Sequence, residues 1–150
     1  MKPLIVLLIT FICSLLILRL IHSAWDFTSS GNIAMGCMLL FTAIGHFKFP
    51  EGMAMMIPEF IPFKKELIYV TGILEIILGI GLLFSSTRFI AGLVSIIFFI
   101  VILPANIHAA IHKIDHEKAT FDGKGKGYLW FRIPLQLFFI AWLLFFSISR

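Results

Sequence analysis

Five long apolar runs, separated by short polar stretches, are the main pattern along the chain. They predict membrane-spanning helices at about residues 4–21, 27–47, 67–84, 89–111 and 128–148. A span needs about 20 apolar residues, with a range of roughly 17–25, and lipid offers the backbone no hydrogen-bond partners. The alternating pattern of an outer-membrane barrel is absent. We therefore predict an all-α integral membrane protein with five transmembrane helices.

Two segments need a separate interpretation. The first run follows Lys2 like a signal peptide, but a cleavage site there would need a small residue two places before Ala24, and His22 occupies that position. We expect an uncleaved N-terminal anchor helix. The segment 48–66 is too apolar for a solvated loop and too interrupted by prolines to span, so we expect a short re-entrant or interfacial piece.

Composition excludes several classes of function. The chain is 60% apolar and only 13% charged, against roughly 45–50% and about 25% in soluble domains. A soluble enzyme, a disordered chain and a free nucleic-acid binder are excluded, so we expect the lipid bilayer, and no nucleic acid, as a partner.

The net charge of +4 is better explained by membrane topology than by nucleic-acid binding. With five spans, eight lysines fall on the side that holds the N-terminus: Lys2, Lys48, Lys64, Lys65, Lys113, Lys118, Lys124 and Lys126. The other side holds three arginines: Arg19, Arg88 and Arg150. We therefore expect a multi-pass protein of a bacterial inner membrane, with a cytoplasmic N-terminus and a periplasmic C-terminus.

Polar residues inside the predicted spans are the candidate site. Ionisable groups in a span are costly and usually face the bundle interior. At about 1.5 Å rise per residue, they all fall in the lysine-rich half of the membrane. The candidate ligand-binding residues are His46, Glu75, Asn106, His108, Arg132 and Gln136.

Two interpretations of these residues stay open. In the functional one, Glu75 and His46 bind or protonate a small ligand in a polar pocket. In the structural one, Glu75 pairs with Arg132, and amides fill the remaining hydrogen bonds of the pair. Gly72 and Gly79 share a helix side with Glu75, which would let a neighbouring helix approach closely there.

A histidine row invites a metal, because His108, His112 and His116 recur every four residues. One such row falls far short of the ligands that a di-iron site needs, so we expect interfacial histidines and no metal.

Four stretches resemble the DoxX family of small bacterial membrane proteins. They are GHFKF at 45–49, MIPEFIPFKKELIYVTGILEIILGIGLL at 56–83, ILPANIHAA at 102–110 and YLWFRIPLQLFFIAW at 128–142. The resemblance implies a DoxX-like four-helix core at residues 27–150, preceded by an added anchor helix at residues 1–26, in a single transmembrane domain. Members of the family are linked to thiosulfate:quinone oxidoreduction and to thiol and oxidative-stress systems, and remote relatives to assembly chaperones.

Two functions follow as expectations. The first is an accessory component of a membrane redox system that binds a quinone or similar amphiphile in the cytoplasmic half, beside a redox partner or in a homo-oligomer. The alternative is a non-enzymatic membrane chaperone or partner-binding subunit with a purely structural polar core. An apolar cavity open to the bilayer would favour the first, and a tightly filled core the second.

Overall fold

The computed structural model describes residues 2–149, and this range contains helices and no strand. Its helical elements are α1 (Lys2–His22), α2 (Phe27–Lys48), α3 (Pro50–Met55), α4 (Lys64–Gly81), α5 (Arg88–Ile111), the 3-10 turn η1 (Lys126–Tyr128), α6 (Leu129–Leu143) and the π-helical turn η2 (Leu144–Ile148).

The five predicted helices are all present, close to their expected positions. The largest boundary error is at α4, which begins three residues before the predicted start at Leu67. The prediction missed this first turn, Lys64 to Glu66, because it is charged. Within residues 2–149, four helical stretches are long and apolar enough to cross a membrane: Lys2–His22, Phe27–Lys48, Arg88–Ile111 and Lys126–Ile148.

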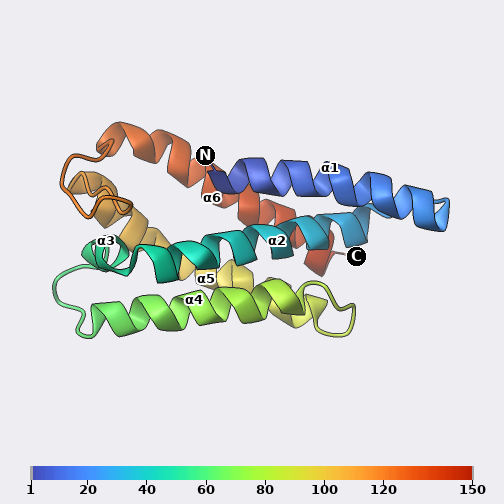
Figure 1. Cartoon of the computed structure of the whole chain (residues 1–150), viewed down its shortest axis with the longest axis horizontal. Helices are drawn as coiled ribbons and strands as arrows, with labels where there is room; N and C mark the ends of the chain where they lie inside the picture. The colour runs from blue at the N-terminus through green and yellow to red at the C-terminus, as the bar shows by residue number, and fades with distance from the viewer. Residues whose placement is uncertain (1, 150) are drawn as a thin grey trace.

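Helix α2 lies at the centre of the bundle, with α1 along one side and α4 along the other (Figure 1). The contact with α4 depends on glycine. A Cβ atom on Gly36 would lie 2.7 Å from the carbonyl oxygen of Gly79, and one on Gly79 would lie 3.0 Å from that of Gly36. The two backbones therefore touch where both residues lack a side chain, as is common between membrane helices.

The C-terminal end of α6 is fastened to α2 by polar groups. Asn32, fully buried, donates to the carbonyl of Phe146 at 2.8 Å and accepts from the hydroxyl of Ser147 at 2.6 Å. Both partners lie in the π-helical turn η2, where the backbone departs from α-helical bonding. Trp142 adds a bond from its indole N–H to the carbonyl of Gly31 at 2.9 Å.

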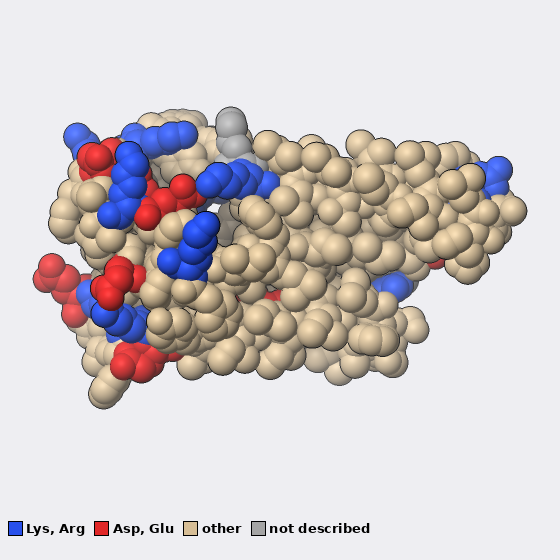
Figure 2. Space-filling view, in the orientation of Figure 1, with Lys and Arg blue, Asp and Glu red and all other residues tan. Residues whose placement is uncertain are grey.

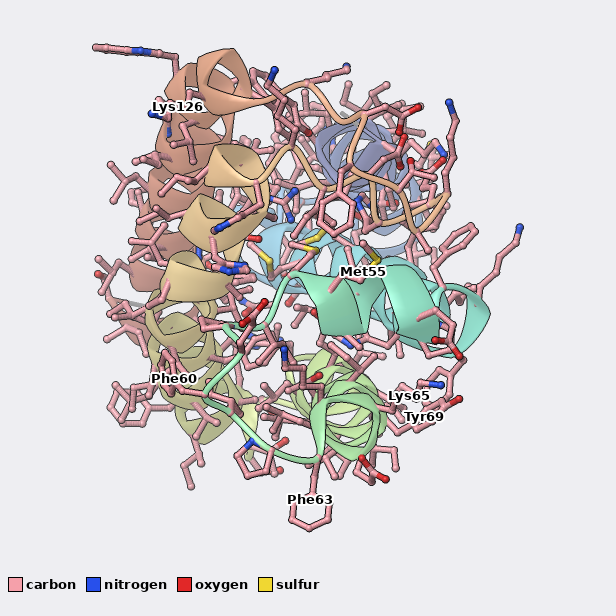
Figure 3. The ribbon with its side chains drawn as sticks, turned by 90° about the vertical axis from the view of Figure 1, so that its left-hand side faces the viewer. Met55, Phe60, Phe63, Lys65, Tyr69 and Lys126 are labelled. Carbon is pink, nitrogen blue, oxygen red and sulfur yellow. The ribbon has the colours of Figure 1, made fainter. Side chains whose placement is uncertain are left out.

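The segment after α2 forms the short helix α3 and a turn that fold against one end of the bundle (Figure 1). Met56 is buried with Ala109 and Ile114. Gly52 lies so close to the backbone of His116 that a Cβ atom there would be 2.1 Å from its carbonyl oxygen. Figure 3 looks onto this end, with Met55 towards the middle of the view and Phe63 pointing outwards.

Charged side chains gather at the same end of the molecule, while the long middle of the visible face carries almost none (Figure 2). Two exposed ion pairs lie there, Lys2–Glu117 at 2.7 Å and Lys65–Glu51 at 2.5 Å. The molecule therefore has a charged end, an apolar body and a second end with few charges, as a membrane protein requires.

Candidate functional site

His46 and Glu75 form a buried pair between α2 and α4. Nε2 of His46 lies 3.5 Å from Oε2 of Glu75, and the two side chains are 11% and 5% exposed. That oxygen of Glu75 is buried and forms no hydrogen bond. Buried polar atoms are usually bonded, so this one calls for an explanation.

The other side of the imidazole is held by the first half of α4. Nδ1 of His46 lies 3.0 Å from the carbonyl oxygen of Ile68 and 3.0 Å from the hydroxyl of Thr71. Gly72 makes this approach possible, because a Cβ atom there would lie 2.7 Å from the Cβ of His46. The predicted glycine side of α4 is therefore the side that receives the histidine.

Asn106 and Gln136 form a second, separate pair between α5 and α6. The amide of Asn106 donates to Oε1 of Gln136 at 3.1 Å, and the amide of Gln136 donates to the backbone carbonyl of Phe99. Pro104, inside α5, has no N–H to donate to the carbonyl of Ile100, which is the residue after this acceptor. Both amide side chains are buried, so they close a polar link inside the bundle.

Arg132 and His108 belong to neither pair. Among residues 2–149 Glu75 is paired with His46 and not with Arg132, so the predicted Glu75–Arg132 pair is wrong. The guanidinium of Arg132 lies instead over the ring of Tyr128, 5.9 Å from its centroid. The error arose because depth along two helices does not tell which helices are neighbours, and α4 packs mainly on α2.

The histidine row ends with α5. His112 is already the C-cap, and its Nδ1 bonds to the carbonyl of His108 at 2.9 Å. The two ring centroids lie 4.1 Å apart with the rings tilted by 35°, and Nδ1 of His108 is buried without a hydrogen bond. No three His, Cys, Asp or Glu side chains come together as metal ligands within the described range.

The loop 112–125 carries three ionisable groups with a lowered pKa outside the spans: His116, Glu117 and Asp122. Burial, and next the charge of Arg132, lower the pKa of His116. The bond from Lys2 lowers the pKa of Glu117. The shift favours the neutral form of His116, and the Lys2–Glu117 pair joins α1 to this loop.

One open space lies away from both polar pairs. It is an apolar groove of about 400 Å³ between α1 and α6, lined by Leu4, Leu8, Trp130, Phe131, Pro134, Leu135 and Phe138. His46 and Glu75 are both buried, and Gly72 lies against the Cβ of His46. By the criterion set from the sequence, the buried polar centre would favour the structural role and the apolar groove would favour the binding of an amphiphile.

Three contributors were missed by the sequence analysis: Thr71, Asn32 and Ser147. Thr71 lies one helical turn before Glu75, and this spacing alone could have identified it. Asn32 and Ser147 lie in the half of the bundle away from the charged end, so the buried polar residues are not confined to one half. Neither has a charge, and a hydroxyl or an amide is a weaker signal in an apolar run than an ionisable group.

Comparisons with known proteins identify one family. The model of a family described as "Domain of unknown function (DUF8561)" matches residues 35–147. No curated protein and no solved structure matches the chain. The resemblance to the DoxX family is therefore wrong. The stretches that carried this resemblance contain short elements such as G-x-x-E and P-A-N. Their glycines let helices pack closely and their prolines end or bend helices, and unrelated membrane bundles use both.

Proposed function

Because the chain belongs to a family described as a domain of unknown function (DUF8561), we propose its function from the geometry. The proposed function is that of a non-enzymatic membrane subunit that binds another membrane protein. Its polar side chains hold its own helices together. The observation that carries the proposal is that both interhelical polar pairs are held by groups of the same chain. His46 is held by Ile68, and Gln136 by the carbonyl of Phe99.

Helix α1 is the surface that we propose for the partner. Only Leu7 and Ser14 of this helix are buried in the bundle. Its outer side carries Ile5, Ile9 and Ile12, which are between 54% and 57% exposed. The family match begins at residue 35, so α1 lies outside the shared part of the chain and is available for a contact of its own.

We further propose that the bundle spans a bacterial inner membrane five times, with the charged end in the cytoplasm. α4 would be the fifth span, because its 18 residues extend for about 27 Å at 1.5 Å per residue, close to the hydrocarbon thickness of about 30 Å. The lysines of the charged end support this orientation through the positive-inside rule.

Photo-crosslinking from Cys13 tests the partner surface. Cys13 is exposed on α1 and Cys37 is half-buried on α2. In native membranes of a Cys37→Ser variant, a benzophenone attached to Cys13 should yield one discrete protein adduct. Its mass tells a second copy from a different protein. In a cysteine-free background, Ile77→Cys on the outer side of α4 should give lipid adducts only. Equal labelling from both positions would reject α1 as the partner surface.

His46→Ala tests the structural role of the polar centre. If His46 fastens α2 to α4, the variant should unfold at lower temperature in detergent and retain the same bound small molecules as the wild type. Thr42→Ala, on the same helix, is the control, because its hydroxyl bonds only to the carbonyl of Leu39 in its own helix. Normal stability with loss of a co-purifying molecule would contradict the proposal.

A second candidate function, binding of an amphiphile such as a quinone or a lipid, is favoured by the apolar groove between α1 and α6. Ligand sites are concave and mostly apolar, with volumes of roughly 300–1,000 Å³, and this groove has about 400 Å³. In this version the protein would serve a membrane redox system as an accessory component. Native mass spectrometry should then show a bound amphiphile that is lost in Leu8→Trp, which fills the groove. It should be kept in Ile9→Trp, because Ile9 does not line the groove.

A further inference from the structure

The buried pair of His46 and Glu75 presents a problem at the level of single atoms. In a neutral imidazole one ring nitrogen carries the proton and the other offers a lone pair. Nδ1 of His46 lies 3.0 Å from the carbonyl of Ile68, in the geometry of a donated hydrogen bond. A carbonyl can only accept, so Nδ1 carries the proton and Nε2 is left with its lone pair.

This lone pair faces an acceptor. Nε2 points at Oε2 of Glu75 across 3.5 Å, and that oxygen has no other hydrogen-bond partner. If Glu75 were ionised beside this neutral imidazole, two lone pairs would face each other. A full negative charge would also be buried in the bundle without a counter-charge, which is very costly.

The opposite tautomer does not remove the difficulty. With the proton on Nε2, the bare Nδ1 would face the carbonyl oxygen of Ile68. The hydroxyl of Thr71 is close enough to donate to Nδ1. It is also placed to donate to the carbonyls of Leu67 at 3.0 Å and Ile68 at 2.9 Å. The negative charge of Glu75 would still lack a cation.

We propose that the His46–Glu75 pair is a proton-binding site, in which one proton is held between Nε2 of His46 and Oε2 of Glu75. The proton converts the facing lone pairs into a hydrogen bond, either as imidazolium and carboxylate or as imidazole and carboxylic acid. In both forms the pair is neutral overall. The site is distinct from the proposed partner surface and does not depend on it.

Within residues 2–149, no other charged group forms an ion pair with His46 or Glu75. The remaining titratable groups on the elements around the pair make no hydrogen bond or ion pair with His46 or Glu75: Lys2, Cys13, Arg19 and His22 of α1, Cys37 and Lys48 of α2, Glu51 of α3, Lys64, Lys65, Glu66 and Tyr69 of α4, Arg88 and His108 of α5, and Arg132 of α6. The same holds for the loop groups His112, His116 and Glu117, which lie beside α3 and the end of α5.

Release of the proton would act directly on the contact between α2 and α4. Gly72 lets His46 press against the backbone of α4, so there is no slack to absorb repulsion between the two groups. Deprotonation would therefore push the helices apart or admit water between them. The site thus makes the packing of α2 against α4 depend on the pH of the surrounding solution.

Spectroscopy of the wild-type protein tests for the proton directly. Nitrogen-15 NMR of histidine-labelled protein in nanodiscs reports which ring nitrogens are protonated, and the His46 signals are assigned by their absence in His46→Gln. Infrared spectra report a protonated carboxylic acid, assigned to Glu75 by its absence in Glu75→Gln. The proposal expects an imidazolium, or an imidazole protonated on Nδ1 beside a protonated Glu75. A neutral imidazole of either tautomer without the acid band would overturn it.

The pH dependence of stability provides an independent test. Between pH 8 and 9 an unfolded chain holds almost no proton on histidine or glutamate. If the folded state holds one, the folding equilibrium constant falls by up to tenfold per pH unit as the pH rises. Glu75→Gln removes this loss, because an amide N–H can donate to Nε2 without an added proton. Exposed Glu66→Gln should behave like the wild type. Equal pH dependence of the wild type and Glu75→Gln would overturn the proposal.

Discussion

At the scale of single residues, several polar side chains in the interior contact neighbouring helices of the same chain. His46 meets α4 through Ile68 and Glu75, and Asn106 meets α6 through Gln136. Their presence in the interior was predictable, because an ionisable or amide group in an apolar run has few other places to go. Their pairing was not, since it depends on which helices are neighbours.

Gly72→Ala tests the closest of these contacts. The added methyl would lie 2.7 Å from the Cβ of His46, so the two helices would have to separate. We expect a loss of about 1–3 kcal/mol in the free energy of unfolding, as is usual for overpacking. The control is Gly45→Ala, where the nearest atom is the flexible end of Met53 at 3.5 Å. Equal stability of the two variants would contradict the tight contact.

Asn106 and Gln136 should behave as a coupled pair. Hydrogen bonds between membrane helices average about 0.6 kcal/mol, with a maximum of about 1.7, in double-mutant cycles. Asn106→Leu and Gln136→Leu should each lower the melting temperature in detergent. The double variant should lose less than the sum of the two. Additive losses would mean that the two amides do not contact each other.

Glu75 and Arg132 should show no such coupling. The structure pairs Glu75 with His46 and places Arg132 over Tyr128. Glu75→Gln and Arg132→Leu should therefore have additive effects on the free energy of unfolding, within about 0.5 kcal/mol, as separated sites usually do. A non-additive result would restore the pair that the sequence suggested.

At the scale of elements, the helices begin and end where local chemistry allows. Asp26 is the N-cap of α2, and its carboxylate accepts from the backbone N–H of Ser29 at 2.9 Å. Pro50 opens α3 in the first turn, where its missing N–H costs nothing. α6 ends in a π-helical turn that offers its backbone to Asn32. The helices were predictable from apolar runs, whereas the cap and the π turn were not identified in advance.

Asp26→Ala should destabilise the fold by about 1 kcal/mol, since loss of an N-cap costs roughly 0.5–2. The bond to Ser29 lowers the pKa of Asp26. Its contribution is therefore complete above the unfolded pKa of about 3.9 and is lost as the pH falls through the folded value. The difference between the variant and the wild type, measured by denaturation in detergent, should shrink in acid. Asp26→Asn should retain the cap, and a constant difference at all pH values would show that the carboxylate does not act as described.

At the scale of the whole molecule, charge is distributed unequally between the two ends (Figure 2). α3 and the loop 112–125 form the charged end, beside the N-terminal part of α1. The other end carries few charges, among them Arg19 and Arg88. The positive-inside rule predicts orientation in the membrane from this kind of asymmetry.

Reporter fusions test the orientation. In a bacterial host, a C-terminal reporter that is active only in the periplasm should work, and a cytoplasmic reporter should not. Moving the cytoplasmic reporter into the loop 112–125 should restore its activity, because that loop belongs to the charged end. The reverse pattern would show that the charged end faces the periplasm.

The sequence by itself determined the class of protein and the course of each long helix. Apolar runs of spanning length have one stable backbone structure in lipid, and the proline-rich segment after α2 cannot continue as one of them. It also identified the ionisable pair of His46 and Glu75, the amides Asn106 and Gln136 and the glycine side of α4, since all are visible as exceptions within apolar runs.

The tertiary structure decided which of these residues meet. Glu75 could have reached Arg132 by depth alone, but α4 packs against α2 through Gly36, Gly72 and Gly79, and the carboxylate therefore faces His46. Depth follows from position along one helix. Partnership follows from how the surfaces of several helices fit together, and that fit is a property of the whole bundle.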